Sequence, residues 1–195
     1  MKWRALIVMI GVLLSASAVS ADDDDDRYLN GMTHGPYRGR VIDADTKAPL
    51  EGAVVLAVWR HVKVYPLHSS TVLYAAREAV TNGDGRFVVD AKTIEESAPR
   101  RTLPPKFVVY LPGYAAYGVL AFPERVLRTG EFVGDGATIG LARLRAPDER
   151  LRQQDFTDPY SFSDDPFKEL PFFSDAFNRD RVQLQLRPLP RERRD

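Results

Sequence analysis

The sequence of 195 residues contains no cysteine. Disulfides, thiol nucleophiles, iron–sulfur clusters and cysteine-based zinc sites are therefore excluded. Histidine is also scarce, with only His34, His61 and His68. None of them has another histidine or an acidic residue three or four positions further on, the short spacing typical of zinc ligands on a helix. The sequence accordingly predicts no metal site.

An excess of charge is also lacking, because 27 Lys and Arg residues balance 27 Asp and Glu residues. A nucleic-acid-binding protein needs a basic field to offset phosphate charge, so nucleic acid is not an expected partner. The nucleophile elbow of serine hydrolases, Gly-x-Ser-x-Gly, does not occur. We expect no catalytic residues and no cofactor.

Long apolar runs are few, and the run at residues 5–14 follows Lys2 and Arg4. A run of this length is too short for a transmembrane helix, which needs ~20 apolar residues. Basic residues, an apolar stretch and small residues up to Ala21 together predict a signal peptide over residues 1–21, cleaved near Ala21. The expected location is the bacterial periplasm or exterior. An uncleaved N-terminal anchor is the alternative, and no later transmembrane segment is expected.

Five consecutive carboxylates, Asp22 to Asp26, follow the predicted cleavage site. Like charges at this density repel one another and stay solvated. A calcium site is the alternative, but the run lacks the glycine turn and the spaced ligands of a calcium loop. We therefore predict a disordered acidic leader over residues 22–35.

The next stretch, residues 36–146, alternates between apolar segments and turn residues. Asn82-Gly83-Asp84-Gly85 is a strong turn signal, and Val54, Leu56 and Val58 share one face of a long strand. Residues 69–80 fit either a strand from residue 74 or a short helix beginning near Ser70, and we favour the strand. The predicted strands are 37–43, 52–64, 74–80, 86–90, 106–111, 115–122 and 138–144. This pattern predicts an all-β, two-sheet sandwich. Its predicted core is Val41, Val54, Leu56, Val58, Phe87, Val89, Phe107, Val109 and Leu141.

Three motifs within this region carry a family resemblance. They are Gly39–Asp43 with Pro49–Val55, then Thr81–Phe87, and then Tyr110–Tyr114, which ends in Pro-Gly-Tyr. In this order they resemble a carboxypeptidase regulatory-like domain, whose fold is similar to that of transthyretin (prealbumin). The resemblance implies a seven-stranded, two-sheet sandwich that acts as a non-catalytic module.

Two constellations could bind a partner. The first is Trp59, His61, Lys63 and Tyr65, which alternate along the long strand and so share one face. An aromatic face with polar tips can stack sugars or hold peptides. The alternative is that Trp59 covers the edge of the core while the other three are solvated.

The second constellation lies in residues 147–195, which hold six of the fourteen prolines. Prolines argue against one long helix, so we expect a short helix over 148–154 and then a mostly irregular extension, with an edge strand possible at Val182, Leu184 and Leu186. Seven aromatics are too many for a disordered tail. We predict a docking segment on the chain's own sandwich, the favoured case, or on a partner. Its aromatics are Phe156, Tyr160, Phe162, Phe167, Phe172, Phe173 and Phe177.

Taken together, these features predict a monomeric, non-catalytic sandwich that binds a protein or glycan, or acts as a scaffold, in the bacterial envelope. One alternative is an accessory subunit that contacts its partner through the aromatic tail. The other is a periplasmic hydrolase, which would cluster titratable groups in one pocket.

Overall fold

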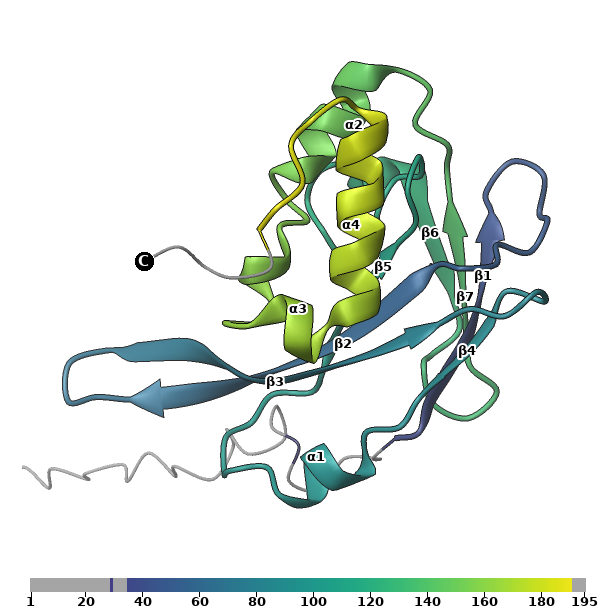
Figure 1. Cartoon of the computed structure of the whole chain (residues 1–195). Helices are drawn as coiled ribbons and strands as arrows, with labels where there is room; N and C mark the ends of the chain where they lie inside the picture. The colour runs from purple at the N-terminus through teal and green to yellow at the C-terminus, as the bar shows by residue number, and fades with distance from the viewer. Residues whose placement is uncertain (1–28, 30–34, 191–195) are drawn as a thin grey trace, which may run out of the picture.

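The computed structural model describes residue 29 and residues 35–190. In this part of the chain seven strands form two sheets, and short helices follow them (Figure 1). The predicted signal peptide lies outside the described residues, as does most of the predicted acidic leader. Leu29 and Gly35 of that leader are described: the Leu29 side chain is buried and its backbone N–H donates to the carbonyl of Thr102 at 2.8 Å.

The first sheet has four strands in the order β4-β1-β7-β6. Strand β1 pairs antiparallel with β4 and parallel with β7, and β6 pairs antiparallel with β7. The bounds are β1 Tyr37–Asp43, β4 Arg86–Val89, β6 Val126–Thr129 and β7 Ala137–Leu141.

The second sheet has three strands in the order β3-β2-β5, all antiparallel. Strand β2 is central and carries the longest apolar run of the three. The bounds are β2 Val54–Val64, β3 Ser69–Val80 and β5 Lys106–Tyr110. The strand alternative for residues 69–80 is therefore correct.

The two sheets pack face to face around one apolar core. Every residue of the predicted core is buried, but the predicted inner face of β2 is wrong. The side chains that meet the opposite sheet are Val55, Ala57 and Trp59, whereas Val54, Leu56 and Val58 point to the other side, where the C-terminal helices cover them. Both faces of β2 are buried, so apolar character could not tell the two faces apart.

The C-terminal extension is helical, which corrects the prediction of a mostly irregular segment. It contains α2 Pro147–Gln154, the single 3-10 turn η3 Pro159–Ser161, α3 Pro166–Glu169 and α4 Pro171–Gln183. A proline opens each of these elements. Proline is tolerated there because the first N–H groups of a helix have no partner within it. The prolines therefore mark helix starts, and they do not exclude the 13-residue helix α4.

Three other predictions of secondary structure need correction. Residues 115–122 form isolated bridges and turns and no strand. The expected edge strand at Val182, Leu184 and Leu186 is the end of α4 and the turn after it. Strand β6 and the short helices α1 Lys92–Glu96 and η2 Pro123–Arg125 were not predicted.

A buried carboxylate connects the end of β1 to the Pro-Gly-Tyr turn. The side chain of Asp43 accepts hydrogen bonds from Tyr114 Oη at 3.1 Å and from Arg143 Nε at 3.3 Å. It also accepts from the backbone N–H groups of Asp45 and Thr46. These bonds, led by the one from Thr46, lower the pKa of Asp43 to about 2. The turn after β5 is thus attached to the other sheet by a charged contact.

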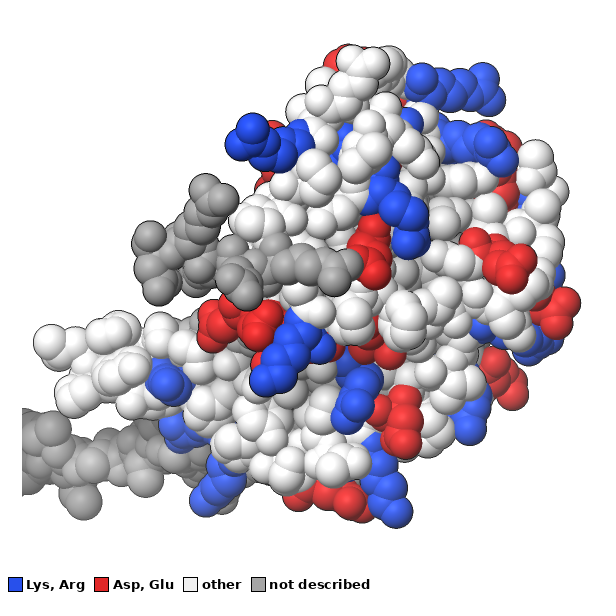
Figure 2. Space-filling model, in the orientation of Figure 1, with Lys and Arg blue, Asp and Glu red and all other residues white. Residues whose placement is uncertain are grey.

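Acidic and basic side chains are interspersed over the face seen in Figure 2, in keeping with their equal numbers in the sequence. Among the described residues, no helix combines the length and the apolar character needed to cross a membrane.

Candidate binding site

The four residues of the predicted binding face do not form one surface. Trp59 is fully buried between the sheets and donates from Nε1 to Glu95 Oε1 at 3.1 Å. His61 is half-buried, Lys63 is exposed near the end of β2, and Tyr65 is exposed just after the strand. Of the four, only Trp59 belongs to the core between the sheets, so the burial of these residues changes from core to solvent along the chain.

The aromatics of the predicted docking segment lie at different depths. Phe162, Phe173 and Phe177 are buried against the outer face of the three-stranded sheet, in one cluster with Leu56, Val108 and Tyr110. Tyr160 and Phe167 are half-buried, and Phe156 and Phe172 are exposed. The segment thus packs on its own sandwich through three of its seven aromatics.

A buried polar network holds α4 in place. Asp180 is fully buried and forms an ion pair with Arg150 of α2. The same carboxylate accepts from Tyr110 Oη at 3.0 Å and from Gln154 Nε2 at 2.8 Å. Burial, and then the charge of Asp180, raises the pKa of Tyr110 well above its ordinary value, so the phenol stays a neutral donor.

The start of α4 is bound by a residue of the sheet. Glu78 of β3 accepts hydrogen bonds from the backbone N–H groups of Phe172 and Phe173, each at 2.9 Å. These N–H groups have no partner within the helix, and a carboxylate also suits the positive end of the helix dipole. Burial raises the pKa of Glu78, while the two N–H groups act in the opposite direction. This contact joins a position in the middle of the chain to its C-terminal helix.

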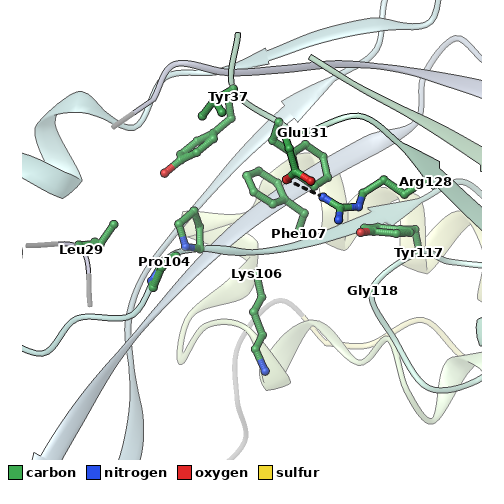
Figure 3. Close-up of a pocket in the computed structure, with 12 residues that line it drawn as sticks. Leu29, Tyr37, Pro104, Lys106, Phe107, Tyr117, Gly118, Arg128 and Glu131 are labelled. Atoms are coloured by element: carbon green, nitrogen blue, oxygen red, sulfur yellow. Dashed lines mark hydrogen bonds and ion pairs between the residues drawn. The ribbon is translucent and has the colours of Figure 1, made fainter. Parts of the chain in front are cut away.

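An open pocket of about 780 Å³ lies at one end of the sandwich, and the sequence did not predict it (Figure 3). Its aromatic residues come from β1, from β5, from the loop after β5 and from the loop after β6. They are Tyr37, Phe107, Tyr117 and Phe132. Phe107 was predicted as a core residue. The other three aromatics lie too far from it in sequence for a local sequence pattern to show that they share a pocket with it.

The aromatic rings form a connected floor. Phe107 and Phe132 stack with ring centroids 3.8 Å apart and planes at 19°, and Tyr37 meets Phe107 edge-on at 5.1 Å. At Gly118 the wall leaves no room for a side chain, because a Cβ there would lie 1.9 Å from the carbonyl oxygen of Phe107. The pocket floor is therefore closely packed.

Three charged side chains line the pocket. Arg128 Nη1 and Glu131 Oε2 are 3.0 Å apart and form an ion pair, drawn as the dashed line in Figure 3. The guanidinium also lies 5.8 Å from the ring centre of Phe132. Lys106 borders the pocket at the beginning of β5, but Phe107 next to it faces the other side of the sheet, and the Lys106 side chain extends away from the aromatic rings (Figure 3). The lining therefore combines an aromatic floor with the ion pair of Arg128 and Glu131.

A buried carboxylate supports the wall formed by Tyr37. The hydroxyl of Tyr37 donates to Glu95 Oε1, and the backbone N–H of Gly35 donates to Glu95 Oε2 at 3.0 Å. Burial, and then the hydrogen bond to Glu95, raises the pKa of Tyr37 above its ordinary value. Tyr37 is therefore neutral and held by its hydroxyl, which makes it a fixed wall.

The chemistry of this lining suits binding. Histidine, serine and aspartate do not occur among the described residues that line it. Elsewhere in the described part of the chain, no group of three or more His, Asp or Glu side chains could hold a metal ion. Concave sites with apolar and aromatic linings are common places for ligands to bind.

Comparisons of the chain with protein-family models, with curated proteins and with solved structures gave no match.

Proposed function

We propose that this protein is an exported, non-catalytic β-sandwich module that binds a protein or glycan in the bacterial envelope. The observation that carries the proposal is the open aromatic pocket around Tyr117 and Phe132, with Lys106 at its side. Aromatic faces stack on sugar rings and on apolar peptide side chains.

The carboxypeptidase regulatory-like fold belongs to the same proposal. Two sheets with seven strands among the described residues support it, as do the positions of the motifs. The side chain of Asn82 accepts from the backbone N–H groups of Asp84 and Arg86 and so forms the Asn-Gly turn. Tyr114 of the third motif hydrogen-bonds to Asp43 of the first.

The test is a screen of the mature chain, residues 22–195, against a glycan array and a displayed peptide library. We expect a ligand whose binding weakens at least ~10-fold in Tyr117→Ala, because a central aromatic contact contributes this much or more. Arg128→Glu should weaken binding of an anionic ligand, because Arg128 lines the pocket beside Phe132. Tyr65→Ala and Lys92→Glu are matched controls at exposed positions outside the pocket.

Two results would contradict the proposal. One is a ligand whose affinity is insensitive to both pocket variants while thermal melts show that the variants are folded. The other is conversion of the ligand into products during the assay, which would favour the hydrolase alternative.

A further inference from the structure

One part of the molecule extends away from the packed layers. Beyond Trp59, strands β2 and β3 continue to pair with each other from Arg60 and Leu73 to Val64 and Ser69, whereas β5 pairs with β2 only over residues 54–58. Residues 101–103 hydrogen-bond to the base of this extension, at Arg60 and Val62, and the remainder projects further out. We call residues 60–73 the β2–β3 arm. Figure 1 shows the arm projecting beyond the body of the sandwich. The pairing of β2 with β3 has a register shift between Trp59 and Arg60, at the base of the arm.

The tip of the arm, residues 64–68, exposes apolar side chains. Val64 and Tyr65 are more than two-fifths exposed, and Leu67 is 97% exposed. The turn itself is ordered, because the backbone N–H of Tyr65 donates to the carbonyl of His68 at 2.8 Å and their rings stack 4.8 Å apart. A defined turn thus presents a leucine, a valine and a tyrosine to the outside.

The charges of the arm are of one sign. Although the whole chain has equal numbers of acidic and basic residues, no Asp or Glu occurs from residue 52 to residue 77. Within that span Arg60, Lys63 and Arg77 are basic, and His61 and His68 can also take up a proton. In Figure 2 the projecting tip is uncharged, with a basic side chain directly behind it and both acidic and basic side chains further back.

We propose that the tip of the β2–β3 arm inserts into the surface of an anionic lipid bilayer. Apolar side chains at a tip can enter the headgroup region while a tyrosine lies at the interface. Cations behind the tip then meet the negative lipid surface. A tip of this size is small for a stable protein–protein interface, which takes ~20–30 residues a side.

The test is sedimentation of the mature chain, residues 22–195, with two kinds of vesicle. One contains phosphatidylcholine alone, and the other also contains about 30% phosphatidylglycerol to supply negative charge. We expect binding to the anionic vesicles and at least ~10-fold weaker binding to the neutral ones, with further loss at high salt because salt screens exposed charges.

Two matched pairs of variants locate the contact. Leu67→Ser should weaken partitioning about 10-fold because it removes the hydrocarbon of the most exposed apolar side chain of the tip, whereas Leu120→Ser, at another exposed leucine, should leave it unchanged. Lys63→Glu should weaken partitioning at least ~5-fold, since each cation near the surface contributes about that factor. Lys92→Glu should have little effect because Lys92 lies on α1, outside the arm.

Two outcomes would overturn the inference. The first is the absence of binding to anionic vesicles, or binding that both arm variants leave intact. The second is binding to a soluble polyglutamate peptide that matches vesicle binding and is insensitive to Leu67→Ser, because the arm would then recognise acidic chains through charge alone. Since all the positions changed are exposed, melting curves of the variants should match that of the original chain.

Discussion

The two faces of the β3-β2-β5 sheet are both buried, but by different partners. The inner face packs against the four-stranded sheet through Val55, Ala57 and Trp59. The outer face packs against the C-terminal helices, with Leu56 in the same cluster as Phe173. The comparison shows that the C-terminal region builds a second core and is not an appendage to a finished sandwich.

The two cores also differ in their polar contacts. At the inner core, the carboxylate of Glu95 accepts hydrogen bonds from the side chains of Trp59 and Tyr37 at one end of the sandwich. At the outer core, the fully buried Asp180 joins α4 to α2 and to β5. Desolvating a charge is costly unless it is paired and hydrogen-bonded, so the Asp180 network favours one arrangement of the helices over others.

The largest loss of stability is expected from Phe173→Ala, which tests whether the C-terminal helices form a second core. The change empties the centre of the outer core and should lower the free energy of unfolding by ~3–5 kcal/mol, as for other buried phenylalanines. The neighbouring Phe172→Ala is the control, because Phe172 is exposed and should cost less than ~0.5 kcal/mol. Urea denaturation measures both. A cost below ~1 kcal/mol for Phe173→Ala would show that the helices are only loosely attached.

Asp180→Ala should lower the free energy of unfolding by a somewhat smaller amount, about 3 kcal/mol. It leaves the guanidinium of Arg150 without its carboxylate in a mostly buried position. Asp175→Ala on the exposed side of α4 is the matched control. If the two variants unfold at the same denaturant concentration, the buried network does not hold the outer core together.

Glu78→Ala should lower the free energy of unfolding least, by about 1 kcal/mol, because it removes the acceptor for the first N–H groups of α4. Glu78→Gln keeps one acceptor oxygen and should cost less, and Glu51→Ala at an exposed turn should cost little. Amide hydrogen exchange sharpens the result, since faster exchange should be confined to the first turn of α4. Faster exchange across both sheets would contradict a local role.

Much of the sandwich could be predicted from local patterns. Strand alternation located β1 exactly and most of β2, β4, β5 and β7, because a period of two and nearby turn residues are properties of the chain itself. Helix α2 was also predicted to within one residue. The sequence likewise carried the signal for α4, in the spacing of Phe173, Ala176, Phe177 and Asp180, but the prolines were read as helix breakers when they open helices.

Other properties were decided only by the tertiary structure. Whether an apolar stripe on β2 meets a sheet or a helix depends on the packing of distant segments, since the hydrophobic effect is non-directional and does not choose a partner. For the same reason Trp59 is buried whereas Tyr65 is exposed, although the sequence predicted both on one face of a strand. The pocket also brings together Tyr37, Phe107, Tyr117 and Phe132 from four segments.

The sequence by itself determined which residues would be strand, turn and apolar, because these depend on neighbours along the chain. The fold decided which apolar faces meet and where a cavity remains, because these depend on contacts between residues far apart in sequence.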